Sequence, residues 1–211
     1  MKEILIWVLG GVLAYLLGSV PFGFIIAKSQ GKDIRTLGSG NIGATNVFRS
    51  ISKKLGVITF ALDVGKGVCG VLLVPLLGGW ISGVEPEGMI LPLFCGAMTI
   101  AGHNWTCFLG FKGGKGIATS AGMLIGLAPV GVGIATLGWL VTFLATRYVS
   151  VASIAACVVL AIAVWPLYIH ELGIWFPATL TLLAFVGIWK HRGNILRLKA
   201  GTESRFNFKR F

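Results

Sequence analysis

Two segments of this sequence combine glycine with positive charge in a way that suits phosphate binding. Residues 38–49 read GSGNIGATNVFR, and residues 110–116 read GFKGGKG. Glycine leaves backbone N–H groups open to an anion, and nearby cations add attraction. We therefore interpret both segments as candidate cradles for phosphorylated substrates.

The second segment carries three bare-backbone positions and two cations. The glycines are Gly113, Gly114 and Gly116, and the cations are Lys112 and Lys115. Gly116 lies where the next helix should begin, so the positive end of the helix dipole would favour an anion there. No Ser or Thr follows the second lysine, which excludes a nucleotide-binding P-loop. A flexible membrane loop with ordinary lysines stays open as the alternative.

The first segment adds hydrogen-bonding side chains and an arginine. Its candidate ligands are Gly38, Ser39, Gly40, Asn41, Gly43, Thr45, Asn46 and Arg49. The arginine could contact a phosphate through two N–H groups at once. The spacing GxGxxG also occurs in dinucleotide-binding folds, but those need a preceding strand, and an apolar membrane stretch precedes this one. A polar turn between helices is the competing interpretation.

A third group of polar residues lies near the carboxyl terminus. His191, Asn194 and Arg197 are spaced three apart, so they share a face if the last helix continues through them. The histidine could carry a proton, bind phosphate as a cation, or have no role at the membrane surface.

Charged and polar residues also occur inside apolar stretches. Asp63 and Lys66 lie three apart within one of them. Charges within a span are costly and are usually paired or functional, so we predict an internal ion pair that shapes the floor of a site. His103 and Asn104 could serve either helix–helix hydrogen bonding or a site.

The composition indicates a membrane protein. The 211 residues are 55% hydrophobic and 12% charged, with a mean hydropathy of +0.88. The net charge is +11, but the basic residues lie in short segments between apolar runs, which argues for anionic lipid and against nucleic acid. No CxxC pair is present, so we expect buried thiols, no metal and no cofactor. The cysteines are Cys69, Cys95, Cys107 and Cys157.

Six apolar stretches could cross a bilayer, which takes roughly 20 residues. They are 4–27, 55–83, 88–111, 116–146, 148–169 and 172–189. The fourth is longer than one span needs and is interrupted at Pro129, so it forms one long helix or two short ones. The first lacks a cleavage pattern and is expected to be retained.

Charge placement favours two crossings for the fourth stretch. In that case 16 of the 18 Lys and Arg residues fall on one side, and Glu85 and Glu87 fall on the other. Basic loops stay in the cytoplasm. We therefore predict an all-α polytopic membrane protein with about seven transmembrane helices, some short or broken. Its amino terminus would lie outside and its carboxyl terminus in the cytoplasm, although the short span before Pro129 could be re-entrant. No repeat or soluble domain is evident, so residues 1–211 are expected to form one domain.

The sequence resembles the bacterial acyl-phosphate:glycerol-3-phosphate acyltransferase (PlsY) family over almost its whole length. The similar motifs are GSGNIGATNVFR at 38–49, GHNWTCFLGFKGGKGIATSAG at 102–122 and HRGNILRLKAGTESRF at 191–206, with LDVGKG at 62–67 and RYVSVAS at 147–153. The resemblance implies transfer of a fatty acyl group from acyl phosphate to the 1-hydroxyl of sn-glycerol 3-phosphate, the first acylation of phospholipid synthesis. Products would be lysophosphatidic acid and inorganic phosphate.

The resemblance also implies roles for particular residues. Residues 110–116 would hold the acyl phosphate. Glycerol 3-phosphate would be held by Arg49, Lys112 or Lys115, His191 and Asn194. Ser39 would orient a hydroxyl or phosphate by a hydrogen bond. Further substrate contacts would come from Ser150, Arg197 and Glu203. The proton acceptor stays open between His191 and the substrate phosphate. The site would lie at the cytoplasmic face of the bacterial inner membrane. The protein would be functionally coupled to an enzyme that makes acyl phosphate.

Two other functions are alternatives to this one. Acyltransferases that use coenzyme A or a carrier protein have His and Asp separated by four residues, but Phe108, Trp175 and Leu196 occupy the positions where that Asp would follow each histidine. An anion transporter would suit the intramembrane charges and broken helices. The absence of repeats and the location of the polar motifs on one face argue against it.

Overall fold

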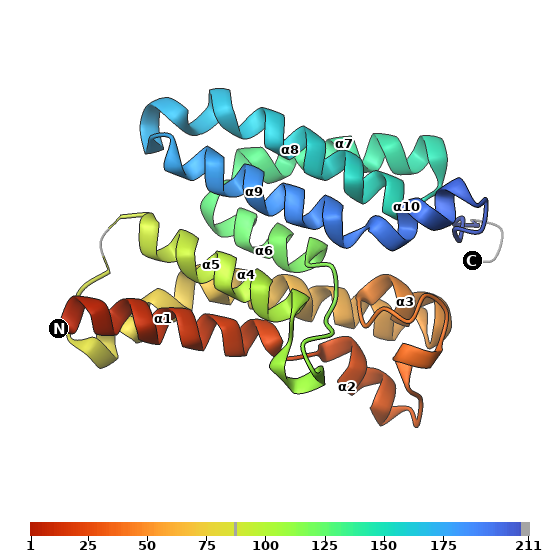
Figure 1. The fold of residues 1–211 in the computed structure, drawn as a ribbon, viewed down its shortest axis with the longest axis horizontal. Helices are drawn as coiled ribbons and strands as arrows, with labels where there is room; N and C mark the ends of the chain where they lie inside the picture. Colours follow the sequence, from red (N-terminus) through yellow and green to blue (C-terminus); the bar gives the residue numbers. More distant parts are fainter. Residues whose placement is uncertain (87, 208–211) are drawn as a thin grey trace. The chain divides into compact units, whose positions relative to one another are not determined.

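The computed structural model describes residues 1–86 and 88–207, and over these residues it contains helices and no strand (Figure 1). Glu87, Lys209 and Arg210, which entered the charge argument, lie outside the described residues. The chain divides into two compact units, Met1–Ala128 and Pro129–Phe211, and each is described by itself. The expectation of one domain over residues 1–211 stays a prediction.

Unit 1 is built on three long helices, with α1 lying along α4 and α5, and α6 along α4 (Figure 1). Its elements are α1 (Lys2–Ser19), α2 (Phe22–Ser29), η1 (Ile34–Thr36), α3 (Ala44–Ser50), α4 (Lys53–Ser82), α5 (Ile90–Asn104), η2 (Cys107–Leu109) and α6 (Ile117–Leu127). One polar loop connects α2 through η1 to α3, and a second connects η2 to α6.

The first apolar stretch does not form one helix. It breaks at Val20, whose φ of −59° and ψ of 113° lie outside the helical region. Pro21 explains the break, because proline excludes the preceding residue from the helical region and has no N–H to donate. The chain resumes as α2, which leads into the first glycine-rich segment.

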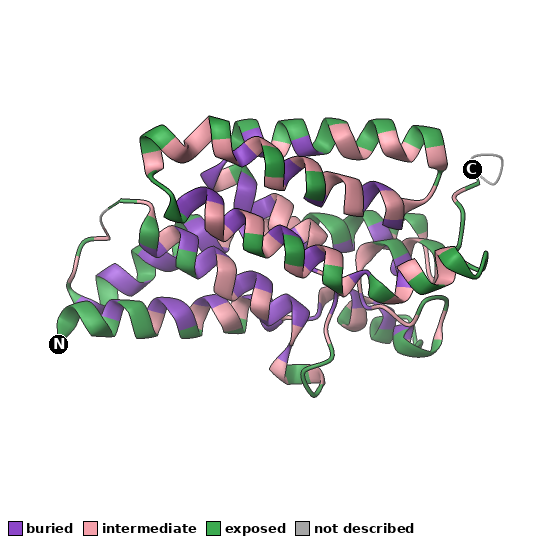
Figure 2. Cartoon of the chain, turned by 45° about the horizontal axis from the view of Figure 1, so that its top comes forward, coloured by how far each residue is buried: buried purple, intermediate pink, exposed green. Residues whose placement is uncertain are grey.

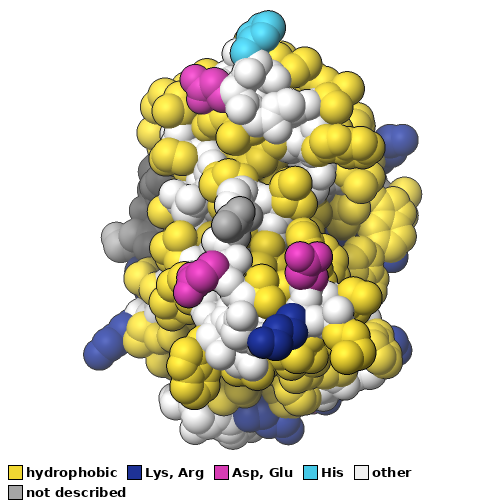
Figure 3. Space-filling model, turned by 90° about the vertical axis from the view of Figure 1, so that its left-hand side faces the viewer, with side chains coloured by type: hydrophobic (Ala, Val, Ile, Leu, Met, Phe, Trp, Pro, Cys, Tyr) yellow, Lys and Arg dark blue, Asp and Glu magenta, His cyan; other side chains and the backbone are white. Residues whose placement is uncertain are grey.

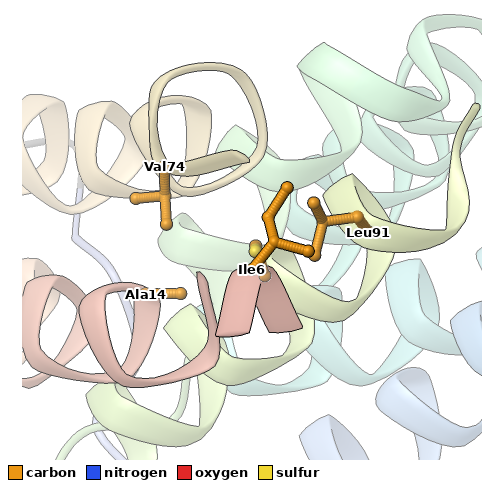
Figure 4. Packing of buried hydrophobic residues seen from close by; sticks show 5 residues of the cluster. Ile6, Ala14, Val74 and Leu91 are labelled. Carbon is orange, nitrogen blue, oxygen red and sulfur yellow. The ribbon is translucent and has the colours of Figure 1, made fainter. Parts of the chain in front are cut away.

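Glycine lets the helices of unit 1 approach at backbone distance. A Cβ on Gly18 would clash with the carbonyl of Thr99, and one on Gly102 would clash with the carbonyl of Tyr15, so α1 and α5 touch through these glycines. Small residues commonly mark such contacts between membrane helices. Nearby, a buried cluster contributed by α1, α4 and α5 contains Ile6, Ala14, Val74, Leu91 and Cys95 (Figure 4).

Unit 2 is a helical bundle in which α8 packs on both α7 and α9. Its elements are α7 (Pro129–Thr146), α8 (Val149–Leu172), α9 (Trp175–Lys190) and α10 (Arg192–Lys199). Because α6 ends at Leu127 and α7 begins at Pro129, the fourth stretch forms two helices, as the charge argument favoured. Trp165 Nε1 donates to Thr181 Oγ1 at 3.1 Å, which satisfies an indole N–H between α8 and α9.

The outer faces of the helices are apolar as well as the inner ones. Exposed residues alternate with buried ones along the helices (Figure 2), and many are large and hydrophobic, such as Val141 and Ile162 at 67% and 68% exposure. Such exposed side chains suit lipid rather than water. The side on which the amino terminus lies also shows acidic and basic side chains and a histidine among its hydrophobic ones (Figure 3).

Helix length supports the same conclusion. Among the described residues, four helical segments are long and apolar enough to cross a bilayer: Lys2–Ser29 across the α1–α2 break, α4, α7 and α8. The shorter helices α5, α6 and α9 occupy the remaining predicted spans. The prediction of an all-α polytopic membrane fold with short and broken helices is confirmed, while the sidedness of the termini stays a prediction.

Candidate functional site

The first glycine-rich segment is a loop organised by the buried side chain of Asn46. Its Nδ2 donates to the carbonyls of Leu37 and Asn41, both at 2.9 Å, and its Oδ1 accepts from the N–H of Ser39 at 3.1 Å. These contacts turn the loop around one amide group and lead it into α3. Asn46 is thus engaged within the loop, and a direct contact with substrate stays a prediction.

The turns of this loop explain its glycines. Gly38 and Gly40 have φ of 54° and 69°, in the left-handed region that favours glycine. Asn41 Oδ1 accepts from the N–H of Gly43 at 2.7 Å, which closes another turn. The side chains that the loop and α3 expose are those of Ser39, Thr45 and Arg49.

The second segment is seated on the carboxyl end of α5. Gly114 N donates to the carbonyl of His103 at 2.9 Å. A Cβ on Gly113 would clash with the same carbonyl, and one on Gly114 would clash with the His103 ring. The sequence interpretation assigned these glycines to the approach of an anion. The structure adds a packing reason, because only glycine lets the loop lie this close to α5.

The end of this loop begins α6, as the sequence predicted. Gly116 caps the helix with a φ of 80°, and Ile117 is the first helical residue. The first N–H groups of a helix have no partner within it and carry partial positive charge. Lys112 is exposed in the loop and Lys115 is half-buried. One loop therefore combines exposed cationic charge with a helix amino terminus.

In unit 2, the carboxylate of Glu203 gathers three predicted site residues. Ser150 Oγ and Asn194 Nδ2 each donate to its Oε1 at 2.7 Å, and Arg197 Nε donates to its Oε2 at 2.8 Å. Burial alone raises the pKa of this carboxyl, but the hydrogen bonds from Asn194, Ser150 and Arg197 outweigh it and hold the pKa below its usual value. Glu203 is therefore an anion that fixes the orientation of its three partners.

His191 lies at the junction of the last two helices. The chain leaves the helix at this residue between α9 and α10, so the condition under which His191 would share a helix face with Asn194 and Arg197 is not met. The ring is 3% exposed, and its Nδ1 lies 2.8 Å from the carbonyl of Gly187. A carbonyl only accepts, so this contact assigns the proton to Nδ1 and makes Nε2 the acceptor in the neutral ring.

The predicted ion pair inside α4 is present. Lys66 Nζ lies 3.0 Å from Asp63 Oδ1, and both side chains are almost fully buried. His103 Nδ1 lies 3.5 Å from the same oxygen, although the sequence did not predict that His103 contacts this pair. Sequence spacing could find the first contact because the residues are three apart on one helix, but the histidine comes from α5.

Glu203 was predicted as a substrate contact, and its role as the common partner of three side chains was not predicted from the sequence. One signal was available, since it is the only acidic residue after Glu171 in a strongly basic tail. Among the described residues, no cluster of His, Cys, Asp and Glu could hold a metal ion. Of the four cysteines, all described and free, Cys95 and Cys157 are buried, whereas Cys69 and Cys107 are only half-buried.

Known proteins are similar to this chain over nearly its whole length. A sequence profile described as "Glycerol-3-phosphate acyltransferase" matches residues 8–201. A glycerol-3-phosphate acyltransferase of Agrobacterium fabrum is 42% identical over 202 residues, which cover 95% of this chain and 92% of the relative. PlsY (YgiH), an integral membrane glycerol 3-phosphate acyltransferase, is 37% identical. Its glycerol 3-phosphate form matches with a TM-score of 0.82 over 97% of each chain, and its lysophosphatidic acid form with 0.78 over 95%.

Proposed function

This chain belongs to the glycerol-3-phosphate acyltransferase family, and we propose that its acyl donor is a fatty acyl phosphate. The acyl group would pass to the 1-hydroxyl of sn-glycerol 3-phosphate, giving lysophosphatidic acid and inorganic phosphate. The observation that carries the donor assignment is the loop at residues 110–116, which joins the exposed Lys112 to the amino terminus of α6. That combination suits a small phosphate.

The sequence supports the same donor. The His and Asp pair of coenzyme A-dependent acyltransferases is absent. An acyl phosphate needs less help than a thioester or amide, because phosphate is a good leaving group. Stabilising the negative charge of the departing phosphate is then the main task, and preorganised N–H groups and cations perform it.

For the acceptor, we assign the cluster around Glu203. The carboxylate holds Arg197 through Nε, so the terminal nitrogens of the guanidinium are those that would bind the phosphate of glycerol 3-phosphate. Asn194 and Ser150, held by the same carboxylate, would contact the glycerol hydroxyls. Within unit 1, Arg49 is exposed beside the first loop and is assigned to a phosphate contact.

The reaction proceeds without a covalent enzyme intermediate. The 1-hydroxyl oxygen forms a bond to the acyl carbon, the bond from that carbon to the phosphate oxygen breaks, and the hydroxyl proton finishes on inorganic phosphate. His191 presents Nε2 as an acceptor, which suits a hydrogen bond from a substrate hydroxyl. We assign it to substrate binding and orientation, since an activated donor needs little help from a base.

The apolar helices support a reaction at a membrane. We propose the inner membrane of a bacterium, with the amino terminus outside and the loops and basic tail in the cytoplasm, because basic segments stay there. The acyl chain of the donor would remain in the apolar region. The donor must come from an enzyme that forms acyl phosphates, since the proposed reaction consumes one in each cycle.

The test is an assay of the purified full-length protein in detergent micelles. Palmitoyl phosphate, palmitoyl coenzyme A and a palmitoyl carrier protein are each offered with radiolabelled glycerol 3-phosphate. We expect labelled lysophosphatidic acid and stoichiometric phosphate release with palmitoyl phosphate alone. Formation of product from either thioester, with none from palmitoyl phosphate, would overturn the donor assignment. In a parallel assay with the protein reconstituted into sealed lipid vesicles, uptake of label without acylation would favour a transporter.

A further inference from the structure

The two charges buried in α4 are not used by the proposed chemistry. Asp63 and Lys66 are each 3% exposed and lie within a membrane helix. A buried ion pair rarely adds stability over apolar residues of similar size, so stability alone does not explain its presence. Its contacts indicate another role.

Lys66 holds the joint between α1 and α2. Its Nζ donates to the carbonyl of Val20 at 3.1 Å and lies 5.6 Å from the centre of the Phe22 ring. Val20 ends α1, and the break at Pro21 follows it. One turn later, a Cβ on Gly23 would clash with the carbonyl of Ile42, which belongs to the first glycine-rich segment. The lysine therefore fixes the element on which that segment packs.

Asp63 reaches towards the second segment. Its Oδ1 lies 3.0 Å from Lys66 Nζ and 3.5 Å from His103 Nδ1. His103 in turn seats the loop: its carbonyl accepts the N–H of Gly114 at 2.9 Å, and its ring lies against the same glycine. One carboxylate thus lies between the residue that fixes the first segment and the residue that seats the second.

The ends of α1 and α5 are joined by hydrogen bonds around this network. Thr106 Oγ1 donates to the carbonyl of Ser19 at 2.6 Å, and Tyr15 Oη donates to the carbonyl of Trp105 at 2.6 Å. These two hydrogen bonds therefore connect the carboxyl ends of both helices. A charge network at this place can set the separation of the loops that follow them.

We propose that Asp63, Lys66 and His103 form a positioning network that fixes the two glycine-rich segments of unit 1 relative to one another. The inference rests on the proposed function, in which both segments bind phosphate groups. A displacement of about 1 Å between reacting groups lowers the rate by roughly a hundredfold. The network does not touch the substrates. It acts through the Val20–Pro21 joint and through Gly114.

The experiment compares two double variants of the full chain. Asp63→Leu/Lys66→Met removes both charges and keeps the volume, so the fold is expected to survive. Asp63→Asn/Lys66→Gln also removes the charges but keeps a donor for Val20 and an acceptor towards His103. Gly65→Ala is the matched control on the same helix, because a methyl there meets open space. The kcat, both KM values and the thermal midpoint are measured with palmitoyl phosphate and glycerol 3-phosphate.

We expect the Leu/Met variant to lose at least about thirtyfold in kcat with a thermal midpoint within a few degrees of the parent. The Asn/Gln variant should regain most of that activity, and Gly65→Ala should match the parent. A parental kcat in the Leu/Met variant would overturn the proposal. The proposal would also be overturned if both double variants lost kcat equally and in proportion to a lower thermal midpoint. That result would indicate that the charges act only in folding.

Two further measurements keep the test decisive. His103→Gln leaves both charges in place, so a parental kcat in this variant would also overturn the proposal even if the Leu/Met variant does not fold. The parent protein separates this inference from the donor assignment. If the parent makes no lysophosphatidic acid from palmitoyl phosphate, the proposed function fails, whereas an active parent with active variants refutes only the network.

Discussion

Glu203→Gln tests whether one carboxylate organises the polar cluster of unit 2. The substitution keeps the length and shape of the side chain and removes its charge. Glu203 accepts three hydrogen bonds, with Ser150 and Asn194 on one oxygen and Arg197 on the other. Glutamine has one acceptor oxygen and one amide that donates. Whichever way it turns, the amide faces a donor that the carboxylate had satisfied.

The size of the effect follows from the hydrogen bonds that are lost. A hydrogen bond to a charged group contributes about 1.5–3 kcal/mol. The Arg197 side chain is 38% exposed, so solvent screening reduces its share. We therefore expect a loss near the lower part of this range, about 2 kcal/mol, in transition-state stabilisation. That corresponds to roughly a thirtyfold lower kcat/KM for glycerol 3-phosphate.

The assay is the initial rate of lysophosphatidic acid formation at varied glycerol 3-phosphate and saturating palmitoyl phosphate. The KM for palmitoyl phosphate should change little. Glu171→Gln is the matched control, because this glutamate is exposed at the end of α8. A Glu203→Gln protein with parental acceptor kinetics would refute the reasoning, since the orientation of the three partners would then not depend on the carboxylate.

The same carboxylate predicts a dependence of stability on pH. The folded-state pKa of Glu203 lies below its ordinary value of 4.5. A lowered pKa contributes stability that is fully present above the unfolded value and is lost as the pH falls through the folded value. The difference in thermal midpoint between the parent and Glu203→Gln should thus be constant above about pH 5.5 and shrink as the pH falls below 4.5. A difference that grows on acidification would contradict this sign.

Four further predictions concern the other site residues and the topology. Arg49→Lys keeps the charge but loses the two-pronged geometry, so kcat/KM for glycerol 3-phosphate should fall at least about tenfold; parental kinetics would remove the arginine from the site. Gly113→Ala places a methyl against the His103 carbonyl and should raise the KM for palmitoyl phosphate, whereas an unchanged KM in a folded variant would make the loop a simple turn. His191→Asn should raise the KM for glycerol 3-phosphate and leave the pH profile of the residual kcat unchanged; loss of its acidic limb would identify a general base instead. In a cysteine-free background, a membrane-impermeant thiol reagent should label a cysteine introduced near Glu85 in intact cells but not one near Lys199, and the reverse pattern would invert the topology.

Much of the fold was predictable because membrane helices follow from hydropathy and proline. The α6–α7 break was expected at Pro129, where the structure has it. The equivalent break at Pro21 was missed because the apolar run continues through it without interruption. Hydropathy depends on the length and composition of an apolar stretch. A single proline can break the helix by removing an N–H, yet it leaves the length and composition of the stretch almost unchanged.

The site was predictable as a set of segments but not as a set of contacts. Spacing found the pair of Asp63 and Lys66 because both lie on one helix. It could not find His103 beside them, or Ser150 beside Glu203, because those contacts join residues 40 or more positions apart. Gly113 is a further contact that the sequence could not show. The sequence predicted a backbone open to an anion, whereas the structure packs this glycine against the His103 carbonyl at the end of α5.

Three acidic residues of this chain each hold a neighbouring cation in place. Asp33 binds Arg35 at 2.7 Å, and the hydrogen bond from that arginine lowers the pKa of the aspartate to about 2. Glu203 binds Arg197 at 2.8 Å, and Asp63 binds a lysine inside α4. Asp33 holds Arg35 through both Nε and Nη2, whereas Glu203 holds Arg197 through Nε and Asp63 holds Lys66 through Nζ. A cation fixed in this way loses less conformational freedom when an anion arrives, and so binds it more tightly. Glu203 is therefore best understood as a support for the phosphate-binding Arg197, which explains why neutralising this acid should weaken the binding of an anion.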